Sequence, residues 1–85
     1  MLKKFSPSQC RGARALLDMT QPDLAARARI GLSTVVDFER QRRSVSDEAR
    51  SKMRDALEEA GIVFIDENGG GAGVRLRKAG GKKAG

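Results

Sequence analysis

The chain has 85 residues, enough for one small domain and too few for two enzyme-sized lobes. Apolar residues make up 39% of it and charged residues 33%, a balance typical of a globular protein. Its 17 Lys and Arg exceed its 11 Asp and Glu, giving a formal net charge of +6. This excess indicates a polyanionic partner, either nucleic acid or an anionic membrane surface.

The residue types that the chain lacks exclude several functions. It contains no His, which excludes acid–base chemistry on imidazole and His-containing metal sites. Its single cysteine, Cys10, cannot form an intramolecular disulfide, which favours a reducing compartment. No apolar run is long enough for a membrane span, and Met1–Phe5 lacks the apolar stretch of a signal peptide. We therefore expect a cytoplasmic protein that is not an enzyme and holds no metal or cofactor. Binding to a membrane surface is disfavoured as well, because no long amphipathic helix joins the basic residues to Trp or Phe.

Capping patterns predict the first two helices. Ser6-Pro7-Ser8-Gln9 places a capping Ser before a first-turn Pro, with Gln three residues after the cap. Thr20-Gln21-Pro22-Asp23 repeats this pattern before a second helix of about two turns. Apolar residues at helical spacing predict the buried faces. These residues are Cys10, Ala13, Leu16 and Leu17 in the first helix, and Leu24, Ala25 and Ala28 in the second.

A tight turn at Arg29-Ile30-Gly31 precedes the third predicted helix, which spans Leu32–Glu39. Val35 and Phe38 lie three apart and are expected to face the core. After a loop anchored by Val45, a fourth helix begins at the cap Ser46 and ends at Gly61. Its predicted apolar face consists of Ala49, Met53, Ala56, Leu57 and Ala60.

After Gly61 the pattern changes from helix to strand. Ile62–Ile65 is a short β-favouring run, and Val74–Arg77 alternates apolar and basic residues. The intervening Asn-Gly-Gly-Gly predicts a turn, so the two runs form a β-hairpin. We therefore divide the chain into a helical domain (1–61), a hairpin extension (62–78) and a disordered basic tail (79–85).

Two short helices joined by a tight turn suggest a helix-turn-helix, and the residues make the resemblance specific. Thr20-Gln21 opens the second helix, and Leu24-Ala25 follows at a fixed distance. Ser33-Thr34-Val35 opens the third, which ends in Glu39-Arg40-Gln41-Arg42-Arg43. Over residues 8–60 the chain thus resembles the phage repressor and Cro type of regulator, the XRE-like family. The resemblance implies an all-α, lambda-repressor-like DNA-binding bundle of four short helices, here followed by a C-terminal β-hairpin.

Three residues depart from the pattern of that family. Arg29 stands where the family usually has Gly in the turn, so we expect Arg29 to adopt a positive φ. Gly31 replaces the Ser or Thr that usually precedes the recognition helix, which weakens its cap. Gln41 replaces the Gly that usually ends this helix.

The third helix is the predicted reader of the DNA major groove. With Val35 and Phe38 facing the core, the opposite arc is left for bases. The residues left on this arc are Leu32, Ser33, Val36 and Asp37. The resemblance to XRE-like regulators implies that they contact bases, with Val36 at the margin. Leu32 or Val36 would pack on a thymine methyl, and Asp37 would accept a hydrogen bond from cytosine N4. The alternatives are a protein contact for Leu32 and Val36, and an ion pair with Arg40 or Arg29 for Asp37.

The resemblance also implies phosphate contacts and one structural ion pair. Gln21, at the positive start of the second helix, would bind a phosphate; its alternative role is to cap that helix. The arginines after the third helix are further phosphate ligands, or else a solvated charge run: Arg40, Arg42 and Arg43. Arg14 and Glu39 match a semi-buried pair that joins the first helix to the third, so Arg14 is not counted as a DNA ligand.

These features favour a homodimeric transcriptional regulator, a repressor associated with the nucleoid, on a palindromic double-stranded operator. An isolated hairpin is marginally stable, so the hairpin is the predicted dimer interface; alternatively it folds back onto its own fourth helix. A different function is also open. An antitoxin-type module would neutralise a partner toxin through exposed Leu32 and Val36 while binding its own operator.

Overall fold

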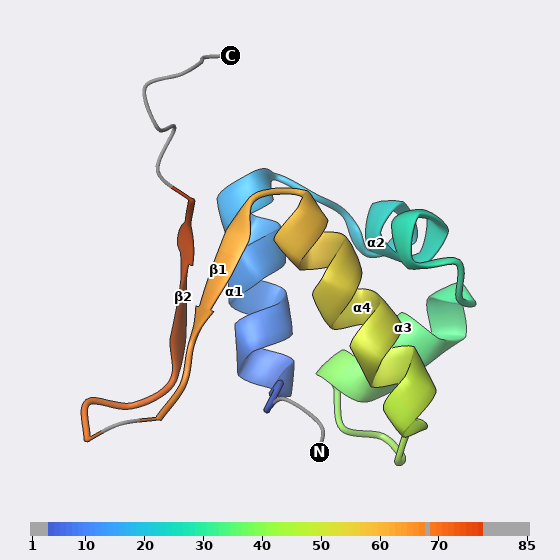
Figure 1. Cartoon of the computed structure of the whole chain (residues 1–85). Helices are drawn as coiled ribbons and strands as arrows, with labels where there is room; N and C mark the ends of the chain where they lie inside the picture. Colours follow the sequence, from blue (N-terminus) through green and yellow to red (C-terminus); the bar gives the residue numbers. More distant parts are fainter. Residues whose placement is uncertain (1–3, 68, 78–85) are drawn as a thin grey trace.

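The computed structural model describes residues 4–67 and 69–77, and within these ranges it forms four helices and a two-stranded hairpin (Figure 1). The elements are α1 (Pro7–Leu17), α2 (Gln21–Ala28), α3 (Leu32–Glu39), α4 (Asp47–Glu59), β1 (Ile62–Ile65) and β2 (Gly73–Leu76). The predicted helices and hairpin are confirmed; the tail predicted at 79–85 lies outside the described residues. No helix in the described ranges has the length and apolar character that a membrane crossing requires.

The helices begin where the capping patterns predict. Ser6 Oγ accepts a hydrogen bond from the Gln9 N–H, and Gln9 Oε1 accepts one from the Ser6 N–H. Thr20 and Asp23 exchange the same pair of bonds at the start of α2. Each reciprocal bond satisfies a backbone donor that the first helical turn leaves free. These contacts are local, so the sequence was sufficient to locate them.

Non-glycine residues in the left-handed conformation end three of the helices, at Asp18, Arg29 and Gln41. Arg29 has φ 59° in the turn between α2 and α3, as expected, and Gln41 has φ 55° after α3. In both turns the following residue's N–H reaches back to a carbonyl inside the helix, from Ile30 to Ala25 and from Arg42 to Asp37. This is the Schellman arrangement, and it turns the chain sharply even where Gly is absent.

The core lies between α1, α2, α3 and α4 and includes Cys10, Leu24, Val35, Met53 and Leu57, all fully buried. Leu16 is a correction to the predicted stripe, because 44% of it is exposed. It precedes Leu17 by one position and therefore points about 100° away from the buried face. Phe5, which periodicity did not identify, stacks on Phe38 and meets Phe64 edge-on, with ring centroids 5.2 and 5.3 Å away.

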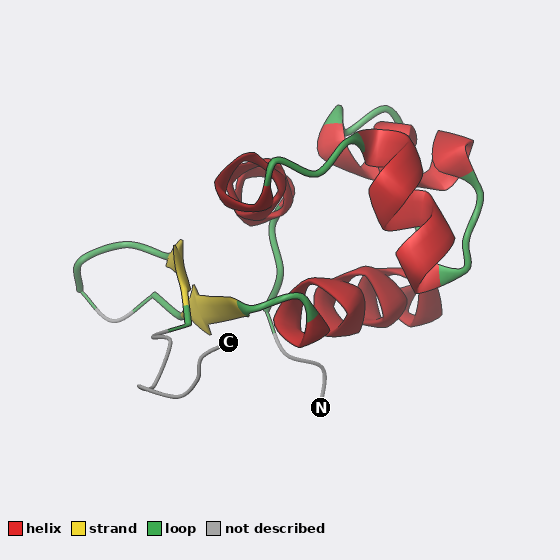
Figure 2. Ribbon diagram, turned by 90° about the horizontal axis from the view of Figure 1, so that it is seen from above, coloured by secondary structure: helices red, strands yellow, loops and turns green. Residues whose placement is uncertain are grey.

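The hairpin packs on two helices rather than on α4 alone. β2 contacts α1 and β1 contacts α4, so the strands lie at the end of the molecule opposite α2 and α3 (Figures 1 and 2). A Cβ on Gly12 would come within 3.3 Å of Val74 Cγ2, so glycine allows this close approach. Gln9 Nε2 donates to the Gly73 and Ile65 carbonyls, at 3.1 and 3.4 Å, and links α1 to both strands.

Arg54 is an unexpected buried charge that joins the hairpin to α4. Its guanidinium lies 4.5 Å from the centre of the Phe64 ring and donates to the Lys4 carbonyl. It also lies 3.4 Å from a Glu58 carboxylate oxygen. Its Nε has no hydrogen-bond partner among the described residues, but the rest of the guanidinium has a carbonyl, a carboxylate and a ring face, so α4 tolerates this arginine on its buried side.

The Gln9 contacts predict that Gln9→Glu destabilises the fold by about 1–3 kcal/mol. The new carboxylate keeps an acceptor for the Ser6 N–H but offers no donor to the two hairpin carbonyls. Urea unfolding at neutral pH measures the difference. Gln41→Glu, the same change at an exposed position, is the control; equal shifts in both variants would show that the Gln9 amide does not hold the hairpin.

Candidate nucleic-acid interface

The outward arc of α3 carries the four predicted base-contacting residues. Val35 and Phe38 face the core at 0% and 7% exposure, which directs the opposite side of the helix to the surface. Leu32 is 45% exposed and Ser33 is exposed, whereas Val36 and Asp37 are half-buried. Gly31 provides no side-chain cap for the start of α3. The surface of α3 that faces away from the core therefore carries both apolar and polar side chains, and it is most exposed at Leu32 and Ser33.

Asp37 is paired with Arg43, which differs from both partners considered from the sequence, Arg40 and Arg29. Arg43 Nε lies 2.8 Å from Asp37 Oδ2. The Asp37 side chain is only 14% exposed, whereas that of Arg43 is 70% exposed. The reason is the turn after α3, which doubles back and returns Arg43 to the helix that it has just left.

The other predicted cations surround the end of α3. Arg40, Arg42 and Arg43 are all exposed. Gln41, in its left-handed conformation, lets the Gln41 and Arg42 N–H groups bond to the Phe38 and Asp37 carbonyls, at 3.2 and 2.9 Å. Because these bonds fix the backbone, the arginines leave α3 from a defined turn rather than from a free loop.

Gln21 does not cap α2, because Thr20 and Asp23 fill that role. Its Nε2 instead donates to Glu39 Oε1 at 3.0 Å, across from α2 to α3. Gln21 also lines a surface hollow at the start of α2. The cationic members of that lining are Arg11, Arg14 and Arg40.

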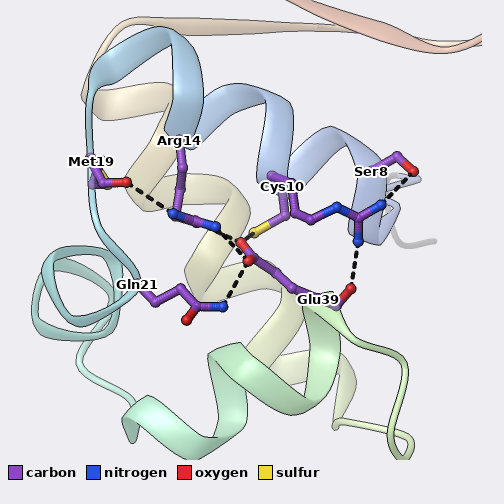
Figure 3. A network of polar contacts seen from close by, with 7 residues as sticks. Ser8, Cys10, Arg14, Met19, Gln21 and Glu39 are labelled. Carbon is purple, nitrogen blue, oxygen red and sulfur yellow. Dashed lines mark hydrogen bonds and ion pairs between the residues drawn. The ribbon is translucent and has the colours of Figure 1, made fainter.

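The Glu39 carboxylate accepts hydrogen bonds from side chains of two other helices, α1 and α2 (Figure 3). Arg14 contacts both of its oxygens, with Nε and Nη2 each 2.7 Å away. Cys10 Sγ donates to Oε2 at 3.0 Å, in addition to the Gln21 bond. Arg14 Nη1 also donates to the Met19 carbonyl at 3.0 Å, just before α2. The structure therefore brings together the two residues predicted as an ion pair and adds two donors that the sequence did not indicate.

Burial and hydrogen bonding act in opposite directions on the charge of Glu39. Burial by itself would raise the pKa of the Glu39 carboxyl, but the bonds from Arg14, Cys10 and Gln21 lower it below its ordinary value. The bond to Glu39 raises the pKa of Arg14, although partial burial acts in the opposite direction. Both residues of the pair are therefore held in their charged forms. Burial raises the pKa of the Cys10 thiol, and the neighbouring carboxylate raises it further. The thiol therefore stays protonated and acts as a donor.

Arg11 is a site residue that sequence reasoning missed. Its Nη1 donates to the Glu39 main-chain carbonyl, and its Nη2 donates to Ser8 Oγ. Spacing was the available signal, since Arg11 precedes Arg14 by three residues and so lies on the same side of α1. Arg11 and Arg14 together fix the end of α3 through its backbone and its side chain.

Comparison with known proteins identifies no family for this chain. A scan against protein-family models gave no match, and a search of curated proteins found no similar protein. Over residues 4–67 and 69–77, no three His, Cys, Asp or Glu side chains gather in a group that could hold a metal ion.

The Glu39 network predicts a large effect of breaking the ion pair. Glu39→Ala should lower the free energy of unfolding by about 3–5 kcal/mol, because Arg14 would keep a charge that is only 18% exposed and unpaired. Arg14→Met combined with Glu39→Leu removes both charges and should recover much of this loss. Urea unfolding compares the three proteins. Identical midpoints would show that the pair does not hold α1 to α3.

The lowered pKa of Glu39 predicts acid sensitivity. Ionised Glu39 stabilises the fold fully above its ordinary pKa of 4.5. That contribution disappears as the pH falls through the lower pKa of the folded state, where the unfolded chain binds the proton more readily. Glu39→Gln should therefore flatten the decline in stability below about pH 4.5, measured by urea unfolding in a pH series. Asp23→Asn is the comparison variant, because the Thr20 backbone bond also lowers the pKa of Asp23, but Asp23 lies outside the Glu39 network. If Glu39→Gln and the parent lose stability equally as the pH falls, Glu39 is not a source of the acid sensitivity.

Proposed function

We propose that this protein is a sequence-specific, double-stranded DNA-binding regulator that acts as a homodimeric repressor. The observation that carries the proposal is the outward arc of α3, where Leu32 and Ser33 are exposed. The opposite side of the helix is fixed by Val35, Phe38 and the Glu39 network. A helix held in this way enters a major groove without losing its packing on the domain. The resemblance of residues 8–60 to XRE-like, lambda-repressor-like domains supports the same function.

The cations beside α3 support a defined orientation on the duplex. Arg40 and Arg42 are exposed where α3 ends, and Arg40 also lines the hollow at the start of α2. Gln21 lines the same hollow with one amide N–H bonded to Glu39, so its second N–H is available to a phosphate oxygen. The positive end of α2 favours an anion at this point. Phosphates on both sides of the groove would thus position α3 without reading sequence.

The hairpin edge supports a dimer. The Arg77 N–H donates to the Gly61 carbonyl, and with the observed register this makes Ile62–Leu76 and Phe64–Val74 the pairs without mutual hydrogen bonds. The N–H and C=O groups of Val74 and Leu76 consequently point away from β1. Leu76 is also 49% exposed. An open edge of this kind pairs with a second copy, and a two-fold dimer matches a palindromic operator.

Phosphate contacts predict a steep dependence of DNA affinity on salt. For an operator selected from random duplex DNA, Arg42→Ala should weaken every sequence alike and reduce the log–log salt slope by about one. The matched control is Arg75→Ala, which removes the same charge from β2, on the hairpin at the other end of the molecule (Figure 1). Because β2 is also the proposed dimer interface, sedimentation velocity first checks that this variant has the parent's mass. Equal losses of affinity and slope in the two variants would show that Arg42 makes no phosphate contact. Absence of any enriched sequence in the selection would contradict sequence-specific binding itself.

Edge pairing predicts that Leu76→Pro converts the dimer to a monomer. Proline removes an N–H that points away from β1, so the hairpin's own ladder remains while the outer edge is blocked. Sedimentation velocity measures the mass of each form. Leu76→Thr is the matched control, since it shortens the side chain but keeps the N–H and should remain dimeric. A proline variant that sediments like the parent would exclude the β2 edge as the interface.

A further inference from the structure

The side chain of Arg43 is bonded to α3 and does not extend freely into solvent. The turn after α3 returns it to the helix, where its Nε donates to Asp37 Oδ2 at 2.8 Å. Asp37 lies one helical turn after Ser33, so the two share the outward arc of α3. The guanidinium therefore rests on the surface that the proposed function directs toward the bases.

The contact leaves the recognition end of Arg43 unused. Only its Nε bonds to Asp37, and the structure shows no bond from either Nη to another described residue. The side chain remains 70% exposed although one end is anchored. Two N–H groups presented in a planar fork match the O6 and N7 acceptors that guanine offers in the major groove.

The pair also removes an electrostatic obstacle. A free carboxylate on the outward arc of α3 would be repelled by the phosphates on both sides of the groove. Paired with Arg43, Asp37 adds no net charge to that surface. Its oxygen then limits the rotation of a long side chain, which reduces the conformational entropy lost on contact with a base.

We propose that Arg43 reads a guanine in each half-site and that Asp37 is the residue that positions it. This inference rests on the proposed DNA binding and specifies one base pair of its target. It reassigns both residues: Arg43 moves from phosphate to base contact, and Asp37 acts through Arg43 rather than on cytosine N4. The change of Asp37 follows from its small exposure, 14%, beneath the guanidinium.

Arg43 on guanine and Asp37 on cytosine N4 both predict a G·C base pair, so the selected sequence alone does not separate these two assignments. Chemical modification of the guanine separates them. Replacing guanine by 7-deazaguanine removes N7 and leaves the cytosine amino group intact. For the parent protein this replacement, at one symmetric pair of positions in the selected operator, should weaken binding by about tenfold. For Arg43→Ala, which has no side-chain donor, it should have no further effect.

Protein variants provide the second arm. Arg43→Lys keeps the charge and should reduce discrimination at that base pair by about tenfold, with the salt slope unchanged. Arg27→Lys is the matched control, because Arg27 is an exposed arginine of α2 with no assigned DNA contact; this variant should select the parent's motif. Asp37→Ala should lose the same discrimination as Arg43→Lys, whereas Asp37→Asn, which keeps an acceptor oxygen, should restore part of it.

The outcomes separate this inference from the function on which it depends. If the parent selects no sequence, both fail. If the parent selects a motif, but Arg43→Lys selects the same motif with equal discrimination and 7-deazaguanine has no effect, only the guanine assignment fails. If Asp37→Asn moves the preference from cytosine toward adenine while Arg43→Lys has no effect, Asp37 itself is the base contact. Thermal unfolding of each variant shows that changes in discrimination come from folded protein.

Discussion

One buried carboxylate controls the position of the surface proposed to bind DNA. Glu39 ends α3, and its oxygens receive donors from α1 and from the start of α2. A charge that is 1% exposed is unfavourable without such partners, so the three elements must meet in one arrangement. The angle of α3, the start of α2 and the turn carrying the arginines all follow from that constraint.

The opposite end of the molecule is organised by polar contacts as well. Gln9 combines a local cap with bonds to both strands of the hairpin, and Arg54 spans the Lys4 carbonyl and the Phe64 ring. In so small a domain the apolar core is limited, and long polar side chains add connections between elements that do not share it. These contacts attach the hairpin to α1 and α4, so in the proposed dimer they would link the interface to the helical domain.

Local interactions could be predicted from the sequence and long-range ones could not. The caps at Ser6 and Thr20 involve residues three apart, so their pattern alone located the helix starts. Periodicity correctly assigned Val35 and Phe38 to the core, but it carries no information about which neighbour a polar side chain will meet. Gln21 bonds to Glu39, and Asp37 bonds to Arg43. Neither partner could be predicted, because each depends on how the loops place one segment beside another.

The two acids of α3 show how a helix that is proposed to face DNA can carry negative charge. Asp37 and Glu39 are two positions apart, so they point about 200° apart around the helix. Glu39 points inward to Arg14 of α1, and Asp37 lies outward under Arg43 from the following turn. Each carboxylate is neutralised by an arginine from outside the helix, and the two pairs serve opposite needs. The inner pair fixes the helix to the domain, whereas the outer pair leaves an anchored guanidinium exposed on the surface proposed to meet DNA.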